Sequence, residues 1–187
     1  MRLRILTMAG AILTFLVSGS AYGQKTFTAH LEGVHETPIV VSTGTGHVTL
    51  TISDDEKSIK YELTYSGLEG NTVPSGKVLF AHVHVGRPTV VGGVAVFFCG
   101  GGNTTATQAA CPTSGTVTGT WTPVDVVGPT SQGVDPANQG ADEAFARLVK
   151  SIKSGLSYAN VHTTRSAGGE IRGQLSPARD HDHDGDD

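Results

Sequence analysis

Short runs in which apolar and polar residues alternate recur along this chain, and they constrain its fold more than any other feature. In the run 45–53, Val48 and Ile52 lie on one side of an extended chain and polar residues lie on the other. The run 58–65 repeats this pattern, and the polar stretch 54–57 between them is typical of a turn. A period of two residues predicts an antiparallel hairpin that is buried on one face.

Other segments predict further short strands, and one predicts a helix. The strands are expected at residues 26–32, 79–86, 94–98, 113–121, 158–163 and 169–175. A helix is expected where apolar residues are spaced to share one helical face, at Phe145, Leu148, Val149 and Ile152. The segment 122–140 is expected to be a long polar loop. The chain is thus predicted to be mostly β, an antiparallel sandwich or barrel with one short helix near residues 142–154.

The first 23 residues are typical of a signal peptide. Arg2 and Arg4 precede an apolar run at 5–17, and small residues lead up to Gly23. The apolar run is short for a helix that crosses a bilayer. We therefore expect a periplasmic or secreted protein that loses residues 1–23 and keeps no attachment to the membrane.

The rest of the chain is expected to form one β domain at residues 24–178, followed by a disordered acidic tail at 179–187. Removal of the signal peptide takes away two arginines and leaves 11 basic against 17 acidic residues. This excess of negative charge disfavours nucleic acid as a partner.

The two cysteines of the chain, Cys99 and Cys111, are 12 positions apart. In an exported protein they lie outside the reducing cytosol, where a disulfide is favoured over two free thiols or a metal-binding pair. We therefore expect the small-residue segment between them to be pinned by a disulfide.

Two histidines lie two positions apart in the apolar run 79–86. If this run is extended, His82 and His84 project from the same face of one strand. A third histidine, His162, lies in the predicted strand 158–163, far along the chain. We expect these two strands to bring the three imidazoles together.

Three imidazole nitrogens can bind one metal ion. Imidazole suits copper and zinc, and intrinsic affinities favour copper. His47 or Glu170 could add a ligand, and Asn160 could orient His162 from the second layer. An open position on the ion would allow redox or hydrolytic chemistry, whereas a closed site would serve storage or structure. The alternative is that the histidines are core residues that bond backbone carbonyls or Glu170.

Several motifs together resemble those of a known family. They are Leu31-Glu32-Gly33 with Glu36 and Pro38, Tyr61-Glu62-Leu63 with Gly67-Leu68, Ala81-His82-Val83-His84-Val85-Gly86, Tyr158-Ala159-Asn160-Val161-His162-Thr163 and Gly169-Glu170-Ile171-Arg172-Gly173-Gln174-Leu175. Over residues 27–175 the chain resembles the CHRD domain, a module of chordin and of many exported bacterial proteins. The resemblance implies an all-β, immunoglobulin-like or Greek-key fold and implies little about activity.

A second resemblance is local. The two histidine strands look like the copper-ligand strands of copper,zinc superoxide dismutases, but the sequence shows no cluster that would supply the bridging histidine and the zinc site. Dismutation is the only enzymatic interpretation that the sequence offers, and we favour a protein that is not an enzyme.

Two functions follow from these observations. In the first, the exported domain binds copper, or less readily zinc, through His82, His84 and His162 for metal handling or a redox step. In the second, it is a non-catalytic interaction module whose histidines are structural. Its loops 86–93 and 122–140 would then contact another extracytoplasmic protein.

Overall fold

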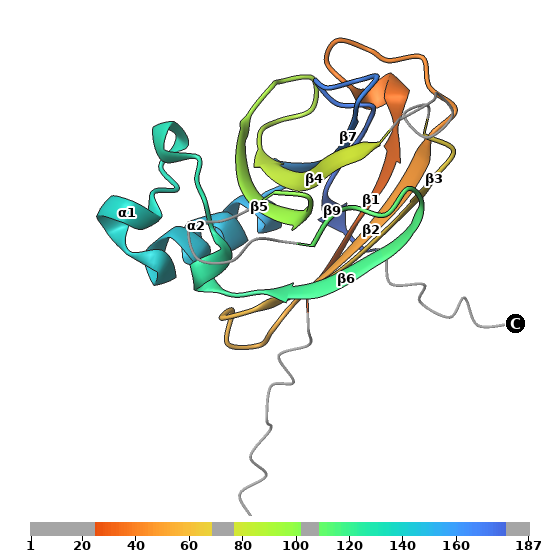
Figure 1. The fold of residues 1–187 in the computed structure, drawn as a ribbon. Coiled ribbons are helices and arrows are strands. Elements are labelled where there is room, and N and C mark those ends of the chain that lie inside the picture. Colours follow the sequence, from red (N-terminus) through yellow and green to blue (C-terminus); the bar gives the residue numbers. More distant parts are fainter. Residues whose placement is uncertain (1–24, 69–76, 102–108, 179–187) are drawn as a thin grey trace, which may run out of the picture.

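The computed structural model describes residues 25–68, 77–101 and 109–178 (Figure 1). The expected signal peptide, 1–23, and the expected acidic tail, 179–187, lie outside the described residues and stay predictions.

Within the described ranges, nine strands form one sheet, and every pair of neighbours is antiparallel. The order is β5-β4-β7-β8-β1-β2-β3-β6, with β9 beside β1. The strands are β1 Lys25–Glu32, β2 Thr45–Ile52, β3 Ile59–Ser66, β4 Val78–Val85, β5 Gly93–Cys99, β6 Gly115–Trp121, β7 Ser157–Thr163, β8 Ile171–Gln174 and β9 Ser176–Pro177. The sheet curves into a nearly closed barrel, which confirms the barrel-like alternative of the predicted fold (Figure 1).

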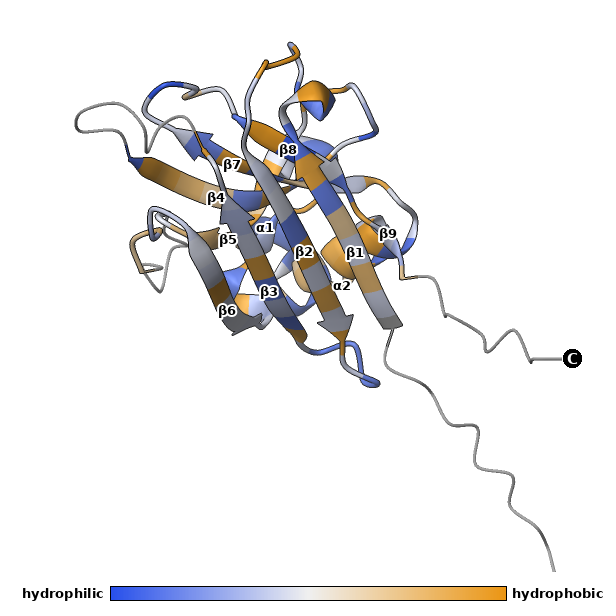
Figure 2. Ribbon diagram, turned by 90° about the vertical axis from the view of Figure 1, so that its right-hand side faces the viewer, coloured by the Kyte–Doolittle hydropathy of each residue, from blue (hydrophilic) through white to orange (hydrophobic). Residues whose placement is uncertain are grey.

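The predicted hairpin of β2 and β3 is confirmed. Its register runs from Ile52 opposite Ile59 to Thr45 opposite Ser66. Every second residue of β3 is buried, as the alternation requires. In Figure 2, β6, β3, β2 and β1 run side by side across the face turned to the viewer.

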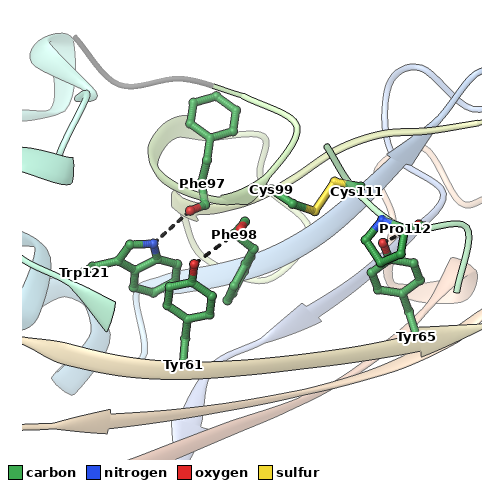
Figure 3. Close-up of a disulfide and its surroundings, with 8 residues drawn as sticks. All are labelled: Tyr61, Tyr65, Phe97, Phe98, Cys99, Cys111, Pro112 and Trp121. Atoms are coloured by element: carbon green, nitrogen blue, oxygen red, sulfur yellow. Dashed lines mark hydrogen bonds between the residues drawn. A yellow bond between two sulfur atoms is a disulfide. The ribbon is translucent and has the colours of Figure 1, made fainter. Parts of the chain in front are cut away.

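The two ends of this sheet, β5 and β6, meet through side chains (Figure 3). The indole N–H of Trp121 on β6 donates to the carbonyl of Phe97 on β5 at 2.8 Å. The hydroxyl of Tyr61 donates to the carbonyl of Phe98 at 3.4 Å, and its ring stacks on Trp121 with centroids 4.4 Å apart. Aromatic residues that carry a hydrogen-bond donor therefore fill the seam of the barrel.

The cysteine pair lies at the same seam. The sulfurs of Cys99 and Cys111 are 2.00 Å apart, which confirms the predicted disulfide. The hydroxyl of Tyr65 donates to the carbonyl of the next residue, Pro112, at 2.7 Å (Figure 3). The disulfide thus ties the segment before β6 to Cys99, the last residue of β5.

The predicted helix is confirmed as α2, Ala141–Lys153. Its four apolar positions, Phe145, Leu148, Val149 and Ile152, are 0–1% exposed and belong to the core. Among the described residues, no helix has the length and the apolar character needed to cross a membrane.

A short helix, α1 (Pro136–Gln139), lies in the segment that was expected to be a loop. Asp135 caps it, since its Oδ1 accepts the backbone N–H groups of Ala137 and Asn138, both at 3.2 Å. An aspartate followed by proline is a recognised helix start, so this local signal was present in the sequence. The prediction of one helix was therefore incomplete.

Candidate metal site

The three predicted histidines lie on one face of two neighbouring strands, β4 and β7. Side chains of the opposite face, which belong to the apolar core and are 0% exposed, are Ala81, Val83, Ala159 and Val161. The alternate positions from Phe80 to His84 and from Tyr158 to His162 carry polar or aromatic side chains that are not in the core cluster. The histidines therefore face away from the aliphatic interior of the barrel.

The register of β4 and β7 sets the neighbours of each histidine. His82 lies opposite Asn160, and His84 lies opposite Tyr158. His162 lies opposite Phe80, so it reaches His82 along a diagonal between the strands. Cross-strand neighbours on one face are close enough for their side chains to touch. The pairing of two strands thus places three imidazoles within one patch.

The three rings form a compact cluster. The ring centroid of His82 is 4.3 Å from that of His84 and 4.6 Å from that of His162. One possible ligand atom from each residue lies within 4.8 Å of the other two. Nitrogens bound to one ion at about 2.0–2.1 Å lie at most about 4.2 Å apart. Small rotations of the rings therefore suffice to bring the three nitrogens onto one ion.

Backbone carbonyls fix which nitrogen of two histidines carries the proton. Nδ1 of His162 lies 2.9 Å from the carbonyl of Ala167, and Nδ1 of His84 lies 2.9 Å from the carbonyl of Gly92. A carbonyl only accepts, so each Nδ1 donates and each Nε2 keeps its lone pair. This arrangement is typical of histidines that bind a metal through Nε2.

The lone pairs of the cluster lack donors. Within the described part of the chain, Nε2 of His162 and Nδ1 of His82 are buried and have no hydrogen-bond partner. Nε2 of His84 faces Oδ1 of Asn160 at 3.1 Å, and an amide oxygen has no proton to give. A buried ring nitrogen without a partner is costly, and a bound cation would satisfy each of these nitrogens in its unprotonated form.

The histidines are neutral at pH 7. Burial, with the proximity of His84 and His162, lowers the pKa of His82 to about 2. Burial also lowers the pKa of His84 to about 4 and lowers that of His162. Because a metal binds only the unprotonated ring, the site needs no proton release from these three side chains at neutral pH.

Aromatic rings enclose the cluster. The ring of Phe80 lies 4.7 Å from that of His162, and the ring of Phe97 lies 5.2 Å from that of His82. Tyr158 stacks on His84 with ring planes 6° apart and centroids 4.6 Å apart. The three histidines are accordingly only 3–7% exposed, although they face away from the core.

Arg172 connects Tyr158 to the loop 86–92, which covers the same face of the sheet. The guanidinium of Arg172 lies 3.4 Å from the ring centroid of Tyr158, on β7. Its Nη2 donates to the carbonyls of Arg87 and Val90 at 2.9 and 3.0 Å. These carbonyls belong to the loop that also supplies the Gly92 carbonyl to His84. Arg172 was not predicted as a site residue because this role depends on the fold.

A buried carboxyl, Glu36, forms the outer layer of the same patch. It is 7% exposed, and its Oε1 has no hydrogen-bond partner among the described residues. Burial raises the pKa of Glu36 to about 6, while Arg172 and Asn160 act to lower it. In the sequence, Glu36 belongs to a motif of the family resemblance, and it was not predicted as a site residue.

Comparison with known families decides the identity of the domain. A model of the CHRD domain matches residues 27–175. This chain belongs to the CHRD domain family. No curated protein and no solved structure matches it. The expected likeness to copper,zinc superoxide dismutases is not shown.

The remaining predicted site residues of this CHRD domain lie around the trio or elsewhere. Oδ1 of Asn160 lies 3.1 Å from Nε2 of His84, whereas His162 was the histidine that Asn160 was expected to orient. The Glu170 carboxylate accepts hydrogen bonds from Ser42 at 2.8 Å and from Thr163 at 2.6 Å. His47 is exposed on β2, between β1 and β3, and is not part of the histidine cluster.

Proposed function

We propose that this CHRD domain protein binds one copper ion through His82, His84 and His162. The observation that carries the proposal is the set of three neutral, buried imidazoles whose free nitrogens have no hydrogen-bond donor. A purely structural histidine in a core normally has its ring nitrogens satisfied. Two of these nitrogens have no partner among the described residues, and the third meets only the amide oxygen of Asn160, which is costly unless an ion completes the site.

Copper fits the donor set better than hard cations do. Magnesium and calcium take oxygen ligands, whereas imidazole suits copper, zinc and nickel. Within the described residues, the cluster contains no carboxylate and no thiolate. Copper stands above zinc in the order of intrinsic affinities, so zinc is the second choice.

We also propose that the protein works outside the cytoplasm, in metal handling or a redox step. The disulfide between Cys99 and Cys111 supports this location, because such bonds persist in oxidising compartments. The composition of residues 1–23 supports it as well, since it is typical of a signal peptide.

The test is the copper content of the purified protein without an affinity tag. The tail histidines, His181 and His183, are replaced by alanine in every sample so that they bind no copper. We expect one copper per chain, and we expect the double variant His82→Ala, His84→Ala to lose it. The matched control is His30→Ala, His47→Ala, which removes two exposed histidines and is expected to keep the copper. A protein that takes up no copper, or loses it equally in both double variants, contradicts the proposal.

A second candidate function, binding of another extracytoplasmic protein, is supported by exposed apolar side chains. The loop after β1 exposes Val34 and Ile39 by 59% and 68%, and the loop after β4 exposes Val90 and Val91 by 50% and 69%. A pocket of about 360 Å³, lined by residues of both loops, lies between them. Exposed apolar side chains that gather in this way often mark interaction sites.

The two candidates differ in how a partner would respond to metal. If the loops bind a protein independently of the histidines, a pull-down with the intact protein finds the partner both with and without a chelator. Replacing Val90 and Val91 by serine is then expected to abolish capture and to leave copper binding unchanged. If the partner is captured only when copper is bound, protein binding depends on the metal site, and the two candidates are parts of one function.

A further inference from the structure

We propose that the site selects copper in its univalent state, Cu(I), over Cu(II) and over zinc. This inference rests on the proposed function, because it specifies the ion that the three histidines hold. Three observations support it: the ligands are uncharged, the site is buried, and the side chains of Phe80 and Phe97 that pack against it are apolar.

The donors bring no negative charge to the ion. His82, His84 and His162 are neutral when they coordinate, and no carboxylate or thiolate of the described residues belongs to the group. An ion bound there keeps its full charge, +1 for Cu(I) and +2 for Cu(II) or zinc. Sites with anionic ligands would instead cancel part of this charge.

Burial makes that difference in charge important. The three side chains are 3%, 7% and 7% exposed, so a bound ion loses most of its contact with water. The Born cost of moving an ion from water into a protein grows with the square of its charge, so it is about four times larger for a dication than for a monocation of similar size. Three neutral imidazoles compensate a monocation more completely than a dication.

The nearest charged side chains do not change this balance. Arg172 lies over Tyr158, which stacks on His84, and its positive charge disfavours further positive charge at the cluster. Glu36 is negative when ionised, but it lies close enough to Arg172 for the two charges to oppose each other. Among the described residues, these two side chains therefore supply no net negative charge to stabilise a dication at this site.

The cover of the site also suits a soft monocation. Phe80 and Phe97 pack against the imidazoles of His162 and His82 and offer no ligand atom. Cu(II) generally adds oxygen ligands to reach tetragonal geometry. The phenyl rings supply none, and the amide oxygen of Asn160 lies in contact with Nε2 of His84. Cu(I) is, like zinc, a d¹⁰ ion without a geometric preference from its d electrons, so three nitrogens can suffice.

The first test compares the affinities of the full chain for the two copper ions, with His181 and His183 replaced by alanine. Cu(I) is measured without oxygen against a chromogenic Cu(I) chelator, and Cu(II) and zinc are measured against chelators of their own. We expect Cu(I) to bind most tightly. Each tenfold preference for Cu(I) raises the reduction potential of the bound couple by 59 mV above that of aqueous copper.

The second test adds one negative charge to the cover. Phe97 is half-buried, so a polar replacement can reach water, and Phe97→Glu places a carboxylate near His82. At an effective dielectric constant of about 20, this charge is expected to reduce the preference for Cu(I) by about 10- to 100-fold. The matched control, Phe97→Gln, has the same shape without the charge and is expected to keep the preference. Phe80→Glu and Phe80→Gln repeat the comparison if the Phe97 variants fail to fold.

The outcomes separate this inference from the function on which it rests. If neither copper ion binds, the proposed function fails. If Cu(II) or zinc binds as tightly as Cu(I), the metal site stands and the selection of a univalent ion is overturned. Equal effects of Phe97→Glu and Phe97→Gln on the preference would also overturn it, because charge would then not decide which ion binds.

Discussion

Histidines face each other across strands in two regions of this barrel, and only one region forms a candidate site. On β1 and β2, His30 and His47 lie directly opposite each other, and both are exposed. On β4 and β7, His82 and His162 lie two residues apart in register, in successive pairs of the same face, and both are buried. Neither pair points into the aliphatic core, and the strand geometry is alike.

The difference between the two regions is what covers them. The outer face of β1 and β2 is open to water, where an imidazole finds hydrogen-bond partners and stays a surface residue. The outer face of β4, β7 and β8 is covered by the loop 86–92, which Arg172 holds through two carbonyls. Histidine spacing alone therefore does not make a site. A cover that excludes water and leaves nitrogens unsatisfied is needed as well.

The largest expected effect follows from removing Arg172, which holds the loop 86–92 over the histidines. Arg172→Ala deletes a 2% exposed guanidinium, its bonds to the loop and its contact with Tyr158. Removing one charge of a buried network costs about 3–5 kcal/mol. We expect a loss of this size in the free energy of unfolding, measured by chemical denaturation.

The control for this variant is Arg87→Ala, because the exposed side chain of Arg87 is dispensable while its carbonyl still accepts from Arg172. Surface substitutions of this kind change stability by at most about 0.5 kcal/mol. Equal losses in the two variants would show that the buried guanidinium does not hold the cover.

The next effect is a dependence of stability on pH in the metal-free protein. His82 and His84 have folded pKa values of about 2 and about 4, below the ordinary value of 6.5. Between about pH 4 and 6.5 the unfolded chain therefore binds more protons, so stability falls as the pH falls through this window. From pH 7 to 5 we expect a loss of about 1–2 kcal/mol for each of these histidines.

Glu36 acts in the opposite direction and provides a control. Its folded pKa of about 6 lies above the ordinary 4.5, so the folded state binds more protons between these values and gains stability as the pH falls. The variant Glu36→Gln should therefore show a steeper loss of stability from pH 7 to 5. A metal-free protein whose stability is flat from pH 7 to 5 would contradict the burial of neutral histidines.

The smallest expected effect is the change in stability caused by His82→Leu, and its sign separates the two candidate functions. His82→Leu removes a buried Nδ1 that has no partner among the described residues. If the ring is kept for metal binding, this variant should gain about 1 kcal/mol in metal-free buffer while it loses copper, since an unsatisfied buried group is costly. If the ring is structural, as in an interaction module, the variant should lose stability. His47→Leu, on the exposed face, is the control and should change little in thermal unfolding.

Much of the fold could be predicted from the alternation of side chains. The hairpin of β2 and β3 has one buried and one exposed face, so its pattern was plain. On β4 and β7 both faces are buried, because a loop covers one of them. The alternation there showed that His82 and His84 share a face, but it could not show which face holds the core.

The site was predicted only as far as local motifs reach. The trio and Asn160 lie in two short segments, and their convergence follows once those strands pair. Arg172 and Glu36 depend on the pairing of β8 with β7 and β1 and on a loop that folds back over the sheet. No local spacing encodes such contacts, which is why these two residues were missed as site residues.

X-ray absorption spectroscopy of the copper-loaded protein tests the central claim most directly, because it observes the ligands of both Cu(I) and Cu(II). We expect about three imidazole nitrogens at about 2.0 Å from the ion, and a signal unchanged by His30→Ala, His47→Ala. A shell dominated by oxygen, or an imidazole shell that persists in His82→Ala, His84→Ala, would contradict it.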